Sequence, residues 1–244
     1  MAKQIRLDKY LADAGVGTRS EVKKLIQKGK VQINGEIIRK PEAKVTEGDQ
    51  VNCEGSEIGQ SEEFEYYLLY KPAGCVTATE DARDKTVMEY VPSNKKGLFP
   101  VGRLDKDTEG LLLITNDGAW AHELLSPKKH VDKTYYARVT GCVTQEAIDQ
   151  IAEGVEIGDE KPALPGFLKI LSASSENDES EILLTIHEGR FHQVKRMMHA
   201  VGHEVTYLKR ISMGGLKLPD SLKKGDCIKL KKEEVDMIRK EKSI

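Results

Sequence analysis

The chain has 244 residues, which suits one large or two modest domains with buried apolar cores. Hydrophobic residues make up 39% and charged residues 32%, as in a soluble globular protein. No apolar run approaches the roughly 20 residues that span a bilayer, and the N-terminal segment lacks the apolar core of a signal peptide, so we expect a cytoplasmic protein with no membrane contact.

The charge is unevenly distributed along the chain. Residues 1–52 carry 11 Lys and Arg against 7 Asp and Glu, a net charge of +4, whereas residues 53–65 carry five Glu and no basic residue. Such an uneven distribution is more informative about binding partners than the net charge of −2 for the whole chain. We therefore expect a basic head domain over 1–52, followed by an acidic linker rich in Gly and Ser over 53–63.

The head contains two expected helices. Residues 3–14 fit an amphipathic helix. Thr18 or Ser20 can cap a second helix, and Thr18 would form a capping box with Glu21; Gly29 ends this helix. The solvent-facing side of this second helix and its end carry the basic residues Arg19, Lys23, Lys24 and Lys30.

Short strands follow these helices. An alternating segment over 31–37 contains an Asn34-Gly35 turn, a strong hairpin signal, and Val45 and Val51 suggest another short strand pair. Two helices and a small sheet with a basic helix face resemble the S4 RNA-binding domain. The resemblance implies that the four basic residues contact RNA phosphates, and such contacts supply affinity but little sequence specificity. Without the resemblance, basic residues on one side of a helix more often form an ordinary solvent-exposed face.

The stretch from Val101 to Gly118 carries the strongest functional signal. A polar loop over 103–110 leads into the apolar run 111–114, and a turn follows at 116–118. This pattern predicts a buried strand with a tight reversal after it. Asp105 then lies on a loop at the edge of a sheet, where it can act as nucleophile, general base or metal ligand.

Metal-site patterns in the chain are incomplete. The loop from Asp105 matches the start of an EF-hand, but Asn116 occupies the position that requires a bidentate Glu. His199 and His203 are four residues apart and lack a convincing third ligand. The four cysteines form no CxxC pair, so we expect neither a metal site nor a disulfide framework.

The remaining elements follow from periodicity and turn signals. We expect strands over 64–70, 133–139 and 182–186, helices over 119–125 and 142–154, a turn over 71–74, a polar loop over 172–180, a helix after Gly189, and a final strand and helix within 223–242.

Three motifs resemble the signatures of RsuA-type pseudouridine synthases. They are GRLD at 102–105 followed by the leucine run, KTY at 133–135 and EGRFHQVKRM at 188–197. Behind an S4-like head, the resemblance covers nearly the whole chain. It implies an α+β fold in which the head precedes a catalytic domain over 64–232, a mixed and mainly antiparallel sheet flanked by helices, and a helical tail over 233–244.

The resemblance also implies residue roles. Asp105 matches the catalytic aspartate, Tyr135 the active-site tyrosine and Lys195 the basic partner of the aspartate, with Arg196 as the competing choice. Without the family, a tyrosine on a strand is more often a packing residue. Further RNA contacts are expected from Arg103, Arg190 and Arg196.

The implied reaction is the isomerisation of a specific uridine in ribosomal RNA, with 16S (small-subunit) RNA favoured, by a monomer that needs no cofactor. Asp105 could attack C6 of the base, attack C1′ of the sugar or remove the C2′ proton. Alternatives are a large-subunit enzyme and a non-catalytic RNA-binding assembly factor. A glycoside hydrolase that pairs Asp105 with Asp107 or Glu109 would need two opposed carboxylates at a set separation.

Overall fold

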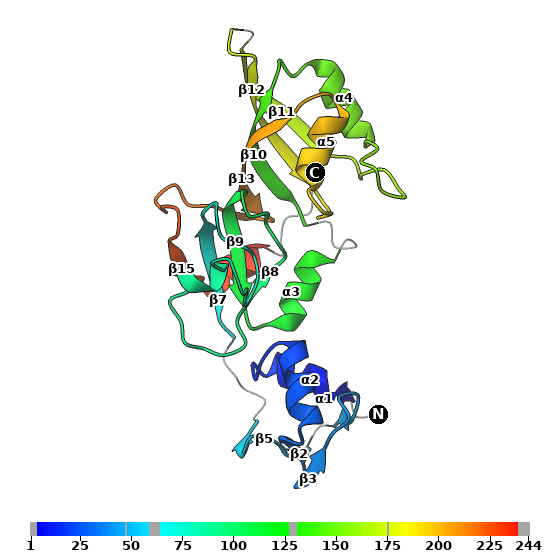
Figure 1. The fold of residues 1–244 in the computed structure, drawn as a ribbon, viewed down its shortest axis with the longest axis vertical. Helices are drawn as coiled ribbons and strands as arrows, with labels where there is room; N and C mark the ends of the chain where they lie inside the picture. Colours follow the sequence, from blue (N-terminus) through cyan, green and yellow to red (C-terminus); the bar gives the residue numbers. More distant parts are fainter. Residues whose placement is uncertain (1–3, 47, 59–63, 127–130, 175, 239–244) are drawn as a thin grey trace.

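A computed structural model describes residues 4–46, 48–58, 64–126, 131–174 and 176–238 (Figure 1). The head and a larger body lie along the long axis of the molecule, with helix α3 (Gly118–Leu125) of the body facing the head. Within the described ranges, no helix is long and apolar enough to cross a membrane.

Over its described residues, 4–46 and 48–58, the head contains two helices and six short strands. These are β1 Ile5–Arg6, α1 Leu7–Asp13, α2 Arg19–Gln27, β2 Val31–Ile33, β3 Glu36–Ile38, β4 Lys44–Val45, β5 Val51–Cys53 and β6 Ser56–Glu57. The predicted capping box is present, since the side chains of Thr18 and Glu21 each accept a hydrogen bond from the other residue's backbone N–H. Asn34 and Gly35 both have positive φ, as a two-residue hairpin turn requires.

Three predictions for the head were wrong in detail. The first helix begins only at Leu7, because the two preceding residues form β1 and pair with β4. Val45 and Val51 do not pair with each other: β4 joins β1, and β5 joins β2. Residues 53–58, expected to begin the linker, contain the β5–β6 pairing around Gly55 and extend the sheet β3-β2-β5-β6. The rest of the expected linker, 59–63, lies outside the described residues.

The body is built around one large sheet. Its strands are β7 Tyr66–Lys71, β8 Phe99–Val101, β9 Glu109–Thr115, β10 Lys133–Thr140, β11 Phe167–Ser174, β12 Glu179–Ile186, β13 Val205–Met213, β14 Leu216–Lys217 and β15 Cys227–Lys229. Their order is β11-β12-β10-β13-β9-β7-β15, with β8 beside β9 and β14 beside β13. Only the β13–β9 pair is parallel among these pairings, so the sheet is mixed and mainly antiparallel, as predicted.

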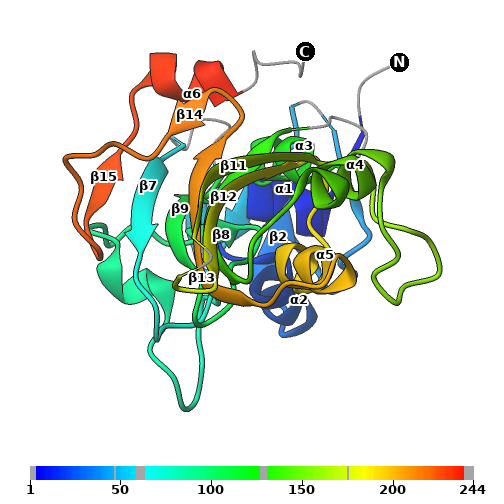
Figure 2. The ribbon, with the colours of Figure 1, turned by 90° about the horizontal axis from the view of Figure 1, so that it is seen from above.

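Helices flank this sheet. They are the short helix η1 Val87–Tyr90 and the α-helices α3 Gly118–Leu125, α4 Gln145–Glu153, α5 Gln193–Ala200 and α6 Lys232–Ile238. Helices α4 and α5 cover the same face of the β10–β13 region (Figure 2). The polar loop predicted over 172–180 was wrong, because β11 and β12 extend into it and pair as far as Ser174 and Glu179.

Strand β9 explains why the leucine run is continuous. All seven of its residues are buried. Leu111 and Leu113 belong to the apolar cluster that includes Trp120 of α3, whereas Leu112 and Ile114 belong to the cluster on the opposite face. A strand covered on both faces needs apolar residues at every position. The predicted reversal after it is a helix start, since the Asp117 side chain accepts a hydrogen bond from the Trp120 N–H and caps α3.

Candidate active site

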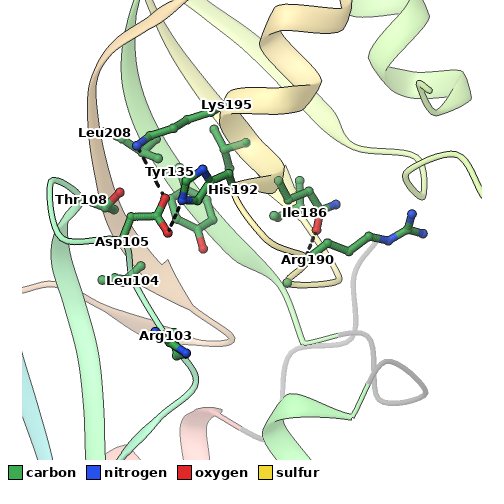
Figure 3. Close-up of a pocket in the computed structure, with 13 residues that line it drawn as sticks. Arg103, Leu104, Asp105, Thr108, Tyr135, Ile186, Arg190, His192, Lys195 and Leu208 are labelled. Carbon is green, nitrogen blue, oxygen red and sulfur yellow. Dashed lines mark hydrogen bonds and ion pairs between the residues drawn. The ribbon is translucent and has the colours of Figure 1, made fainter. Parts of the chain in front are cut away.

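Asp105 lies on the loop between β8 and β9, at the edge of a cavity (Figure 3). Its neighbour Leu104 is fixed from both sides: the Leu104 N–H donates to Thr77 Oγ1 at 3.2 Å, and the Thr77 hydroxyl donates to the Leu104 carbonyl at 2.7 Å. The Asp105 side chain keeps 29% of its surface exposed. The loop therefore presents a carboxylate that a substrate can reach.

The far end of this loop depends on a glycine. Gly110 has a φ of 107°, and a Cβ at this position would lie 2.2 Å from the carbonyl oxygen of Arg210 on β13. No side chain fits there, because real Cβ atoms essentially never come so close. Gly110 thus allows β13 to pair in parallel with β9 directly beside the Asp105 loop.

Lys71 supports the Asp105 loop through hydrogen bonds to backbone carbonyls. Its ammonium group is fully buried and donates to the carbonyls of Pro72 at 3.0 Å, Thr108 at 2.9 Å and, less closely, Lys106 at 3.4 Å. Burial lowers the pKa of Lys71, and nearby Cys75, Asp107 and Asp105 oppose that shift only in part. Lys71 was predicted to open a turn over 71–74; in the structure it is the last residue of β7, and the sequence did not indicate its supporting role.

Replacing this lysine tests that support. We expect Lys71→Met to lower the free energy of unfolding by roughly 2–3 kcal/mol, because buried carbonyls lose their donor. Urea unfolding followed by circular dichroism measures the change. Lys106→Met is the matched control: Lys106 is half exposed and pairs with Asp84 at the surface, so its loss should cost less than about 1 kcal/mol. Equal effects of the two changes would contradict the supporting role.

Two side chains of the EGRFHQVKRM segment face Asp105. His192 Nε2 lies 3.5 Å from one carboxylate oxygen, and Lys195 Nζ lies 3.6 Å from the other. Lys195 also contacts both oxygens of Asp107 at 2.8 Å. Burial alone would raise the pKa of Asp107, but the hydrogen bonds and charge of Lys195 outweigh it and hold that pKa below its usual value. Lys195 is therefore shared between two carboxylates.

The choice left open between Lys195 and Arg196 has a structural answer. Arg196 points away from Asp105 and donates to the carbonyls of Ile157 and Phe191 and to the carboxylate of Asp159. Lys195 is the residue that contacts Asp105.

Arg190 has similar internal contacts. Its guanidinium donates to Glu188 at 3.0 Å and to the carbonyls of Lys161 and Pro162 at 2.7 and 2.9 Å. Arg190 still lines the cavity, but most of its donors are engaged within the protein. Arg190 and Arg196 together fasten the turn before α5 to the segment over 157–162.

Tyr135 lies on β10 behind Asp105. It is buried, with 7% of its surface exposed, and stands in register between Leu184 of β12 and Arg210 of β13. Together with Asp105 and Thr108 it lines a small cavity of about 60 Å³, and the buried Thr108 hydroxyl there has no hydrogen-bond partner among the residues that the structure describes. Tyr135 thus borders the same small cavity as Asp105.

A larger cavity of about 780 Å³ adjoins this site, a volume within the range of small-molecule and nucleotide sites. The exposed Arg103 lines it together with Asp105, Lys133, Phe191 and His192. Four more of the predicted RNA-binding residues lie on the head. All four are exposed, and they lie on α2 or just after it: Arg19, Lys23, Lys24 and Lys30. None of those four lines this cavity.

Lys133 places a buried cation at the cavity wall. Burial lowers its pKa to about 8, and nearby Arg210 acts in the same direction, whereas Asp132 and Glu188 oppose the shift. The ammonium group donates to the Val131 carbonyl at 2.9 Å. In the folded protein this lysine therefore loses its proton at a lower pH than in the unfolded chain.

This shift predicts a pH dependence of stability. Between about pH 8 and 10.5 the unfolded chain binds more protons at Lys133 than the folded protein does. Burial of the Lys133 charge destabilises the folded protein by roughly 3 kcal/mol below pH 8, and this destabilisation declines as the pH rises. We expect the free energy of unfolding of the wild type to rise by up to roughly 3 kcal/mol relative to that of Lys133→Met between pH 7.5 and 10.5, whereas the loss of the hydrogen bond to the Val131 carbonyl adds the same offset at every pH. Urea titrations of both proteins at several pH values measure this; a difference independent of pH would contradict it.

The sequence assigned no role beside Asp105 to His192, although it stands in the segment that supplied Lys195. Asp107 was considered as the second carboxylate of a hydrolase, whereas in the structure it shares Lys195 with Asp105. The φ of 49° at His192 is left-handed, which is uncommon outside glycine and typical of functional turns. Among the described residues, no group of three or more His, Cys, Asp or Glu side chains is arranged to hold a metal ion.

Comparison with known proteins agrees with this arrangement. Residues 65–200 match the model of the family described as RNA pseudouridylate synthase, and residues 5–51 match the S4 domain. The chain is 42% identical to ribosomal large subunit pseudouridine synthase B of Bacillus subtilis, over 96% of this chain and 95% of that protein. It is 41% identical to ribosomal small subunit pseudouridine synthase A of Vibrio parahaemolyticus, over 96% and 99%.

A solved structure is similar over the same span. A crystal structure of a pseudouridylate synthase matches with a TM-score of 0.70 and 36% sequence identity, covering 96% of this chain and 99% of that one. The similarity includes both the head and the body.

Proposed function

This chain belongs to the RNA pseudouridylate synthase family, and from that membership we propose that it isomerises a specific uridine of small-subunit (16S) ribosomal RNA, with Asp105 as the catalytic carboxylate. One observation carries the role of Asp105: its carboxylate stands between His192 and Lys195, at the wall of a nucleotide-sized cavity. The exposed basic face of the S4 domain supplies RNA affinity.

The reaction needs little beyond such a site. The N1–C1′ bond breaks, the base turns, C5 bonds to C1′, and the C5 proton leaves while N1 gains one. Atoms and electrons balance without an oxidant or a cofactor. The target base must leave its stack, at an expense of a few kcal/mol, to enter the cavity. Asp105 starts the reaction and Tyr135 lies against the base, where it is our candidate to take the C5 proton; Arg103 holds the RNA backbone or fills the vacated stack.

The neighbouring charges suit this chemistry. Lys195 places a positive charge 3.6 Å from the Asp105 carboxylate. Lys195 also binds Asp107, so the cation is held in place before a substrate arrives. We propose that Lys195 orients Asp105 towards the substrate and balances its negative charge.

The choice of 16S RNA rests on the wording of the KTY and HQVKRM motifs and on relatives named small subunit synthase A in two Vibrio species. The alternative is large-subunit RNA, for which a relative of similar identity is named. We further propose that the protein acts as a monomer in the cytoplasm, where it would meet this RNA.

Release of tritium from RNA labelled at C5 of uridine tests the proposal, because the C5 hydrogen leaves when the new bond forms. Purified protein is incubated separately with small-subunit and large-subunit RNA transcribed in vitro, and with partly assembled subunits. We expect stoichiometric release from one position of the small-subunit RNA. Release from large-subunit RNA alone would reassign the substrate, and salt-sensitive binding without release from any substrate would favour an assembly factor.

A further inference from the structure

We propose that Phe191, backed by the imidazole of His192, is a stacking platform for a base next to the target uridine. This inference rests on the proposed function and adds a substrate contact to it. Phe191 is 75% exposed, and its ring stacks on His192 with the centroids 3.7 Å apart and the planes 18° from parallel. Both residues line the large cavity beside Asp105.

An exposed aromatic residue does not by itself indicate a binding site, since single apolar residues are common on protein surfaces. What distinguishes Phe191 is how firmly its backbone is held. Its carbonyl accepts a hydrogen bond from Arg196 Nη1 at 3.0 Å, and the N–H of the preceding Arg190 donates to Gln193 Oε1 at 2.9 Å. The following residue, His192, is fixed in a left-handed conformation.

The two arginines extend this support to a neighbouring segment. Arg196 and Arg190 both bind the carboxylate of Asp159, and Arg190 also binds the carbonyls of Lys161 and Pro162. The turn that carries Phe191 is thereby tied to a second loop. The backbone of Phe191 is therefore fixed, and one face of its ring already rests on His192. A turn held in this way loses little further freedom when a ligand binds, which favours affinity.

The chemistry of the platform indicates a nucleobase. Stacking on aromatic side chains is the common way in which proteins hold unpaired bases, and it tolerates any base because each has a π-face. The same turn brings His192 to within 3.5 Å of Asp105. A base stacked on Phe191 would therefore stand beside the nucleotide whose sugar and base reach Asp105.

The contact can be tested by removing each partner in turn. The substrates are synthetic RNA fragments spanning the modified uridine, either intact or with an abasic nucleotide on its 5′ or its 3′ side. KM, kcat and the dissociation constant are measured for wild type and Phe191→Ala on all three RNAs. Phe167→Ala is the matched control, because Phe167 is 67% exposed on β11 and lines neither cavity.

On intact RNA we expect Phe191→Ala to raise KM and the dissociation constant by roughly 10- to 100-fold, with kcat changed less than about threefold. On one of the two abasic RNAs, KM and the dissociation constant of the wild type should rise by the same factor. On that RNA, Phe191→Ala should show no further rise in either constant. Phe167→Ala should match the wild type throughout. If Phe191→Ala has the same KM as the wild type on intact RNA, the proposal is overturned.

A purely structural role gives a different pattern. If Phe191 only positions His192, Phe191→Ala lowers kcat, and it does so on both abasic RNAs as well as on intact RNA. This result would also overturn the proposal. Failure of the proposed function is separate, because it shows as absent turnover by the wild type on intact RNA. The dissociation constants decide on the stacking contact in that case as well.

Discussion

Asp105→Asn is expected to abolish pseudouridine formation, lowering kcat by at least about 10⁴-fold, while the dissociation constant for RNA changes less than about threefold. An amide has nearly the shape of the carboxylate but can act neither as an anionic nucleophile nor as a general base. Its loop would remain in place, because the contacts of Leu104 with Thr77 and of Lys71 with three carbonyls do not involve the Asp105 side chain.

The matched control is Asp107→Asn, the same change two residues along the same loop. The Asp107 side chain is 70% exposed and serves in our account only to share Lys195. We expect this variant to lose less than about tenfold in kcat. Tritium release under single-turnover conditions, with RNA binding measured in parallel, distinguishes the two variants. Comparable losses in both would mean that the charge of the loop, and not Asp105 itself, drives the reaction.

Lys195→Met is expected to have the second-largest effect, a fall in kcat of about a hundredfold, which corresponds to about 2.7 kcal/mol. Opposite charges 3.6 Å apart, partly screened at an effective dielectric of about 20, interact by roughly 4 kcal/mol. The exposure of both side chains reduces that figure. Without the cation, Asp105 would also face Asp107 uncompensated.

Lys195→Arg tests whether charge or shape matters. An arginine keeps the positive charge and can bind a carboxylate with two donors, so we expect it to recover most of the activity. Lys106→Met again serves as the control, since Lys106 also lines the cavity but pairs with Asp84. A kcat for Lys195→Met within about threefold of the wild type would rule out this role of Lys195.

Much of the fold was predictable because its signals are local. The capping box at Thr18 and the Asn34-Gly35 turn each specify one element through contacts between near neighbours in sequence. The continuous leucine run specifies a strand by its apolar composition alone, although its partners β7 and β13 lie far away in the sequence. The S4 and catalytic parts were likewise recognisable from ordered motifs. Strand partners were harder to predict: β4 pairs with β1 and β5 with β2, choices set by packing across the whole head.

The site was predictable in its motifs and not in its geometry. The order of GRLD, KTY and HQVKRM pointed to Asp105, Tyr135 and Lys195, and the structure brings these three together around one cavity. The internal pairing of Arg190 and Arg196 with Asp159 was not visible, because it joins segments about thirty residues apart through an irregular loop. Sequence patterns identify a basic residue but do not show whether its donors are already engaged.

The most direct test of the account is to map pseudouridine at single-nucleotide resolution. Small-subunit RNA from cells lacking this protein is incubated with wild type or with Asp105→Asn, and carbodiimide-dependent stops are read by primer extension. The account predicts one new stop with the wild type and none with the variant. A stop that appears equally with both proteins would contradict the role of Asp105, and no stop with either, on naked RNA or on partly assembled subunits, would contradict the proposed activity.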